Sequence, residues 1–287
     1  MKTSLWIGIV LLMAAHVPAQ NLFVASDASI YEFTPGGVQS TLASGMSSPY
    51  GLAFDGSGNL YVASLGDNAI YKFTPAGVES TFASGLDGPY GLAFDSAGNL
   101  YEADFSSGNV NKFTPGGVKS TFATGLSEPY GLAFDAAGNL FESDFAGANI
   151  NKFTPGGVKS TFASGVSPTG FGCFGLAFNK AGDLFAGDFL GAGNIYQFTP
   201  GGVKSTFASG LQGPFGLAFN SAGILFAADA SGNIYEFTPD GVRSTFVSGV
   251  NGIGLAFEPV PEPSALGLLA AGAAILFPFV RRPGMAA

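Results

Sequence analysis

The chain has few of the side chains on which most enzymes depend. Among its 287 residues there are one cysteine, one tryptophan and one histidine. Trp6 and His16 both fall within the first nineteen residues, so the rest of the sequence has neither. Without a histidine, a serine, threonine or cysteine nucleophile lacks its usual general base. Cys173 has no second cysteine with which to form an intramolecular disulfide. A buried, inert thiol is expected there, and the alternative is a disulfide to another molecule.

Positive charge is also scarce. The whole chain carries 11 basic and 20 acidic residues. Setting aside Lys2, Arg281, Arg282 and Glu262 leaves 8 basic and 19 acidic residues between positions 20 and 258. A surface with such a deficit cannot neutralise phosphates, which excludes nucleic acid as a partner.

The most prominent feature of the sequence is a motif that recurs six times. It contains Phe-Thr-Pro, whose phenylalanines are Phe33, Phe73, Phe113, Phe153, Phe198 and Phe237. It also contains Gly-Leu-Ala-Phe, which begins at Gly51, Gly91, Gly131, Gly175, Gly216 and Gly254. A period near forty residues is typical of folds in which each unit buries its apolar surface against its neighbours.

One repeat, Gly91–Leu126, contains four short apolar runs bounded by Gly, Pro, Asn, Asp or Ser. These turn-forming residues predict four strands, at Gly91–Phe94, Leu100–Ala103, Val110–Thr114 and Val118–Ala123. No amphipathic run of ten or more residues interrupts them to indicate a helix. Four antiparallel strands per forty residues indicate a blade of an all-β propeller.

The two ends of the repeat region predict how the ring closes. Three strands are predicted at the start of this region, Asn21–Ala25, Ile30–Thr34 and Val38–Ala43. They correspond to the second, third and fourth strands of a blade. The last segment, Gly254–Phe257, corresponds to a first strand alone. We therefore expect residues 20–258 to form a six-bladed β-propeller, in which the N-terminal strands and the C-terminal strand share one sheet.

Residues 1–19 have the pattern of a secretory signal peptide. Lys2 provides the positive start, Leu5–Ala15 the apolar core, and Val17-Pro18-Ala19 the small residues before a cut. We expect export through the Sec machinery with cleavage after Ala19.

Residues 259–287 form a Pro-rich spacer, an apolar segment and a basic end. As a helix, the apolar run Ala265–Val280 spans about 24 Å, less than the roughly 30 Å of a hydrocarbon core. Together with Pro261, Glu262, Pro263 and the basic Arg281 and Arg282, it resembles the PEP-CTERM sorting signal of Gram-negative bacteria.

That resemblance implies transient membrane contact and processing by an exosortase-like enzyme. It also implies a location at the cell surface, in the outer membrane or in the extracellular matrix. The alternative is a permanent C-terminal membrane anchor formed by the predicted hydrophobic helix.

The blade motif is similar to the NHL repeat and to gluconolactonase-like propellers. The similar phrase is Pro-Tyr-Gly-Leu-Ala-Phe-Asp, followed by Gly-Asn-Leu-Tyr or Gly-Asn-Leu-Phe, at 89–104 and 129–144. The resemblance implies the fold for almost all of Asn21–Phe257, but constrains function weakly. Lyases of this group depend on histidine, which is missing here. The lactonase-like enzymes hold Ca²⁺ or another divalent cation in the central tunnel with carboxylate and Asn ligands.

Candidate ligands for such a cation are the aspartates that end four second strands: Asp104, Asp144, Asp188 and Asp229. Glu102 and Glu142 precede two of them on the same strand face. The recurrence of the same Asp from blade to blade favours a structural role instead. Each carboxylate would accept hydrogen bonds from loop N–H groups and fix its turn.

Aromatic residues precede five of the predicted first strands: Tyr50, Tyr90, Tyr130, Phe174 and Phe215. We expect them to rim a mouth shared with the aspartates. The pattern favours a non-enzymatic binding or structural module of the extracellular matrix, without catalytic residues or cofactor. Its ligand would be a polysaccharide or a cationic peptide. The alternatives are a divalent-cation-dependent lactonase or esterase, and a rigid spacer that binds nothing.

Overall fold

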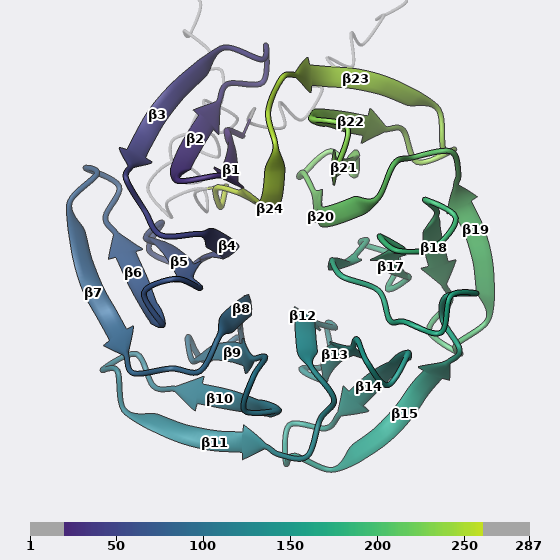
Figure 1. Cartoon of the computed structure of the whole chain (residues 1–287), viewed down its shortest axis with the longest axis horizontal. Helices are drawn as coiled ribbons and strands as arrows, with labels where there is room; N and C mark the ends of the chain where they lie inside the picture. The colour runs from purple at the N-terminus through teal and green to yellow at the C-terminus, as the bar shows by residue number, and fades with distance from the viewer. Residues whose placement is uncertain (1–19, 261–287) are drawn as a thin grey trace, which may run out of the picture.

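The computed structural model describes residues 20–260, which form a ring of six four-stranded antiparallel sheets (Figure 1). The predicted all-β, six-bladed propeller is confirmed. No helix able to cross a membrane is found within residues 20–260. The predicted signal peptide and the predicted sorting tail from position 261 onward lie outside the described residues.

The four strands of each blade follow one another outward from the axis of the ring. The first strands surround the axis and are β4 (Pro49–Phe54), β8 (Pro89–Phe94), β12 (Pro129–Phe134), β16 (Leu176–Phe178), β20 (Pro214–Phe219) and β24 (Gly252–Phe257). The second strands are β5 (Leu60–Ser64), β9 (Leu100–Asp104), β13 (Leu140–Asp144), β17 (Leu184–Gly187), β21 (Leu225–Asp229) and β1 (Leu22–Ser26).

The outer half of each blade completes the sheet. The third strands are β6 (Ala69–Phe73), β10 (Asn109–Phe113), β14 (Asn149–Phe153), β18 (Ile195–Phe198), β22 (Asn233–Phe237) and β2 (Ser29–Phe33). The outermost strands are β7 (Glu79–Ser84), β11 (Lys119–Ala123), β15 (Lys159–Ser164), β19 (Lys204–Ala208), β23 (Arg243–Ser248) and β3 (Gln39–Ser44).

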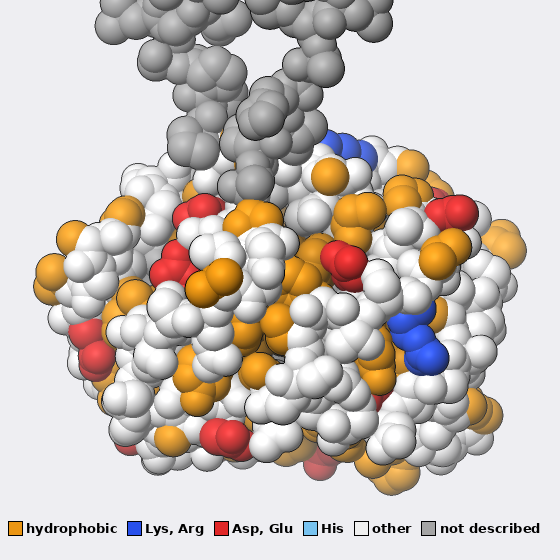
Figure 2. Space-filling model, turned by 90° about the horizontal axis from the view of Figure 1, so that it is seen from above, with side chains coloured by type: hydrophobic (Ala, Val, Ile, Leu, Met, Phe, Trp, Pro, Cys, Tyr) orange, Lys and Arg blue, Asp and Glu red, His pale blue; other side chains and the backbone are white. Residues whose placement is uncertain are grey.

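The core lies between neighbouring blades. Every residue of the second strands is buried, whereas the outermost strands begin with three exposed residues. The phenylalanine of each Phe-Thr-Pro phrase is at most 2% exposed; Phe113, for example, packs with Tyr61 and Leu100 across a seam between blades. Burying each such ring contributes roughly 1.5–3 kcal/mol to stability. The outer rim carries scattered single charges among uncharged and hydrophobic side chains (Figure 2), which protects exposed strand edges from aggregation.

The glycine of Gly-Leu-Ala-Phe is required where the first strands of neighbouring blades approach each other. A Cβ on Gly91 would collide with the backbone carbonyl oxygen of Tyr130 in the next blade. The same collision would occur between Gly254 and Tyr50, which continues the contact across the point where the ring closes. Only glycine permits this approach of two backbones.

The ring closes as the order of the strands predicted. Strand β24 pairs antiparallel with β1, with Leu22 opposite Phe257 and Ala25 opposite Gly254. The Glu258 N–H donates to the Asn21 carbonyl oxygen at 3.2 Å just beyond the paired residues. The first blade is therefore assembled from both ends of the described chain.

Candidate functional site

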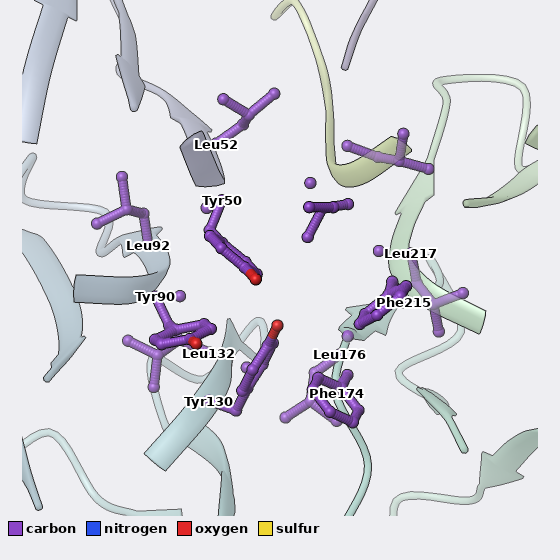
Figure 3. Close-up of a pocket in the computed structure, with 18 residues that line it drawn as sticks. Tyr50, Leu52, Tyr90, Leu92, Tyr130, Leu132, Phe174, Leu176, Phe215 and Leu217 are labelled. Atoms are coloured by element: carbon purple, nitrogen blue, oxygen red, sulfur yellow. The ribbon is translucent and has the colours of Figure 1, made fainter. Parts of the chain in front are cut away.

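The first strands enclose an axial cavity of about 100 Å³. Three layers of six residues line it, one residue from each blade in each layer (Figure 3). The aromatic layer is Tyr50, Tyr90, Tyr130, Phe174, Phe215 and, in the first blade, Ile253; a glycine layer and a leucine layer follow. The predicted mouth residues are thus all brought together around one cavity.

A local irregularity in the strands aims the tyrosines at the axis. In β8, Pro89 pairs with Asp104, but the register shifts before Leu92 pairs with Glu102. A bulge of this kind re-aims the side chain between the two pairs. The same shift recurs in β4, β12 and β20. This is why Tyr90 and its equivalents project inward beside a glycine.

The aromatic layer forms a nearly continuous arc. Ring centroids are 4.6 Å apart for Tyr50 and Tyr90, and 4.5 Å for Tyr90 and Tyr130. The arc continues at 4.2 Å to Phe174 and 5.2 Å to Phe215. Such spacings allow favourable aromatic pairing, so the rings support one another's positions. The cavity has three phenols on one side and Phe, Phe and Ile on the other.

The phenols of Tyr90 and Tyr130 are neutral at physiological pH. Burial, followed by the nearby Tyr50 phenol and the charge of Glu128, raises the pKa of Tyr90 to about 12. Burial also raises the pKa of Tyr130 well above its usual value of 10. Figure 3 shows the Tyr50 and Tyr130 hydroxyl groups pointing toward each other across the pocket. The polar side-chain groups of the cavity are therefore a small group of phenol hydroxyls.

A second row of rings, not predicted from the sequence, supports the first. Phe105 packs on Tyr90 with centroids 4.9 Å apart, and Phe145 lies 4.8 Å from Phe174. Phe189 stacks on Phe215 at 3.9 Å. Each follows an aspartate at the end of a second strand: Asp104 and Asp144 are the last residues of β9 and β13, and Asp188 is the first residue after β17. The dipeptide Asp-Phe was therefore the signal that could have revealed them.

The aspartates predicted to share this mouth lie elsewhere. Asp104, Asp144, Asp188 and Asp229 are all at most 5% exposed, and none of them lines the axial cavity.

Each of these carboxylates instead turns toward the loop that precedes the first strand of its own blade. Asp104 Oδ2 accepts from the Asp87 N–H at 3.2 Å, and Asp229 Oδ2 accepts from the Gln212 N–H at 2.7 Å. Asp144 accepts from the Ser127 N–H, and Asp188 accepts from the Ser167 hydroxyl. These contacts are those expected of residues that fix loops.

The axial residues do not fit a divalent cation. Ca²⁺ takes six to eight oxygen ligands, mainly carboxylates and carbonyls. The cavity is lined by Tyr, Phe, Ile, Leu and Gly side chains, without a carboxylate or amide. No cluster of three or more His, Cys, Asp or Glu suited to a metal occurs within residues 20–260. The ligand set implied by the gluconolactonase-like resemblance is therefore not assembled at the axis.

Two neighbouring blades contain a buried polar cluster. Asn111 Nδ2 donates to Glu102 Oε2 at 2.9 Å and to Asp104 Oδ2 at 3.1 Å. In the next blade, Asn151 makes the same two contacts with Glu142 and Asp144.

Both glutamates of these clusters are fully buried, and each has one oxygen without a hydrogen-bond partner among the described residues. Burial raises the pKa of Glu102 to about 8, and the adjacent Asp104 charge adds to the shift. The pKa of Glu142 is also raised to about 8 by burial, with Asp144 contributing.

Cys173 lies in the irregular loop before β16 and is fully buried. Burial raises the pKa of its thiol to about 12, so the reactive thiolate is not formed at neutral pH.

The fold and axial cavity place the chain among six-bladed β-propellers. No family model and no curated protein matches the sequence. Among solved structures, the chain is similar to one in the nidogen/laminin complex, with a TM-score of 0.75 and 20% identity over 84% of this chain and 98% of that one. It is also similar to a gluconolactonase from Xanthomonas campestris, with a TM-score of 0.66 and 16% identity over 84% of each chain.

A third neighbour is virginiamycin B lyase from Staphylococcus aureus. A structure of a catalytically inactive variant of that lyase, in which a histidine is replaced by alanine, matches with a TM-score of 0.65 and 15% identity. The match covers 85% of this chain and 94% of that one. At these identities the likenesses establish the fold.

Proposed function

We propose that this propeller is a binding module of the extracellular matrix and that the aromatic axial mouth is its ligand surface. The observation that carries the proposal is the axial cavity itself. Five rings from five blades converge there, held by glycine contacts between the blades and by a second row of phenylalanines. Concave apolar sites with a few convergent polar groups are the usual form of ligand pockets in proteins.

The residues at the axis support binding without chemistry. The histidine replaced in the inactive S. aureus lyase has no counterpart here, because His16 is the chain's only histidine and precedes the propeller. A lactonase of the gluconolactonase-like class would need oxygen ligands for its cation, and the cavity lining provides none from carboxylate or amide side chains. The binding function is therefore favoured over the lactonase or esterase.

The likeness to a chain of the nidogen/laminin complex also supports a binding function. That propeller is found in an assembly of two proteins. Near-identical blades are suited to displaying a rigid surface, since each blade contacts only its neighbours and the ring as a whole is closed.

Export and surface sorting belong to the same proposal. Two segments of the sequence support it. One is the predicted signal peptide that ends at Ala19, and the other is the tail with Pro261, Glu262, Pro263, Arg281 and Arg282. Intact-mass measurement of the protein from its own cells checks this part. We expect an N-terminus at Gln20 and loss of the apolar tail. A full-length chain that fractionates with cytoplasmic proteins would contradict it.

The mouth is tested by replacing two of its rings. We expect the double variant Tyr90→Ala with Tyr130→Ala to lose at least about tenfold in retention on extracellular polymer isolated from the producing cells, because truncating central aromatic contacts typically costs 2 kcal/mol or more. Val118→Ser, at an exposed position on the opposite end of the ring, is the matched control and should bind as the original does. Circular dichroism verifies that both variants fold. Unchanged retention of a folded double variant would refute the mouth as the ligand surface.

A further inference from the structure

We propose that the axial mouth takes a quaternary ammonium group, such as a trimethylated amine borne on a polymer or peptide. This inference rests on the proposed function and specifies the ligand class of the same site. It depends on three features of the described residues: the aromatic lining, the small number of side-chain acceptors for N–H donors, and the acidic residues in the turns around the mouth.

The lining provides the attraction for a cation. Tyr50, Tyr90 and Tyr130 are consecutive around the axis, and Phe174 and Phe215 complete the arc. Faces of aromatic rings attract a cation within about 6 Å of their centroids, most strongly where water is excluded. The phenols of Tyr90 and Tyr130 remain protonated, because their pKa values are raised, so these two rings carry no charge.

The polar groups of the cavity distinguish between kinds of ammonium. A primary ammonium has three N–H donors, and leaving buried donors unpaired is costly. The only side-chain acceptors that face the cavity are three phenol oxygens, and all three come from one side of it, so they cannot surround an ammonium group. A quaternary ammonium has no N–H groups to satisfy. Its methyl groups also suit the leucine layer below the rings.

The charged side chains in the turns around the mouth that are not buried are all of one sign. The turns around the mouth carry four acidic residues that are not buried: Asp27, Asp67, Asp87 and Glu128. None of the eight Lys and Arg residues within 20–260 lies in these turns. They lie on third strands, at the start of outermost strands or in the turn between β16 and β17: Lys72, Lys112, Lys119, Lys152, Lys159, Lys180, Lys204 and Arg243. A mouth lined by one sign of charge raises the local concentration of oppositely charged ligands.

Glu128 connects this charge to the rings. It directly precedes Pro129, the first residue of β12, and lies close enough to Tyr90 for its charge to raise the pKa of that phenol. The same negative charge would attract a cation bound at the mouth.

The test compares two ligands of the same shape that differ in charge. Choline is titrated into the protein by isothermal calorimetry beside 3,3-dimethylbutan-1-ol, its neutral carbon isostere. We expect choline to bind at least about tenfold more tightly, the difference that cation–π attraction from one or two desolvated rings supplies. Tyr90→Leu, which keeps an apolar side chain, should weaken choline binding about tenfold and leave the affinity for the isostere within about twofold.

A second variant removes charge at two positions that are not buried, and circular dichroism verifies that it folds. Asp87→Asn with Glu128→Gln should weaken choline binding about two- to fivefold at low salt, and this loss should shrink at high salt. Val118→Ser, at the opposite end, should bind choline as the original does.

The outcomes separate this inference from the proposed function. Equal binding of choline and its isostere overturns the cation preference and leaves the mouth as an apolar binding site. Binding of neither ligand also overturns the preference; the proposed function then stands only if the Tyr90→Ala, Tyr130→Ala variant loses matrix retention. If neither ligand binds and that variant is retained normally, both proposals are refuted.

Discussion

The chemical groups that are hardest to predict from the repeat belong to single residues at which some blades differ from the others. In four blades the middle of the second strand is Val24, Val62, Ala186 or Ala227, and each pairs with a tyrosine of the third strand. In the other two blades the pair is Glu102 with Asn111 and Glu142 with Asn151. Both members of the pair change together. The exchange therefore installs a buried carboxyl together with its hydrogen-bond donor, because a buried polar group without a partner is costly.

This exchange predicts a dependence of stability on pH. The pKa of Glu102 rises from its usual 4.5 to about 8 on folding, and Glu142 behaves likewise. Between these pH values the folded state holds a proton that the unfolded chain releases. The free energy of unfolding should therefore fall as pH rises from about 4.5 to about 8, by up to about 1.4 kcal/mol per unit for each glutamate.

Chemical denaturation across this range measures the slope. The double variant Glu102→Gln with Glu142→Gln keeps the shape and loses the titration, so its stability should be nearly flat over the same interval. Glu79→Gln on an exposed outer strand is the control and should retain the original slope. An unaltered slope in the double variant would show that other groups produce the pH dependence.

At the scale of strands, most of the fold could be predicted from the sequence. The recurring turn residues located all four strands of each blade, and the order of strands at the two ends located the closure between β1 and β24. The boundaries differed by small amounts: β8 begins at Pro89, two residues before the predicted start. The bulge that follows Pro89 explains the difference, since it breaks the simple alternation on which strand prediction depends.

The direction of the aspartates could not be predicted in the same way. Because Asp104 ends the second strand of its blade, the sequence predicted that it lies beside the mouth. Its side chain instead turns into the blade, where the carboxylate accepts a hydrogen bond from the Asp87 N–H. That partner lies seventeen positions away and becomes a neighbour only when β8 pairs with β9. The second row of rings escaped prediction for a similar reason: Phe105 follows β9 and becomes a neighbour of Tyr90 in β8 only when the two strands pair.

At the scale of the whole molecule, six similar blades produce one distinctive place. Around the rim the repeat presents nearly the same surface six times, whereas at the axis one residue from each blade meets the other five. Small differences between blades, such as Tyr in three, Phe in two and Ile in the sixth, are therefore combined into one asymmetric cavity. Closure of the ring brings one residue from each blade to the axis in every layer, and this creates a cavity that no single blade contains.

The most direct measurement of this account is hydroxyl-radical footprinting of the tyrosines, with and without extracellular polymer from the producing cells. Tyr50 and Tyr90 are partly exposed at the mouth, and Tyr31 and Tyr71 are partly exposed on third strands away from the axis. We predict that the polymer slows oxidation of Tyr50 and Tyr90 and leaves the rates of Tyr31 and Tyr71 unchanged. Protection of Tyr31 and Tyr71 with Tyr50 and Tyr90 still oxidised at their original rates would contradict the axial mouth as the binding site.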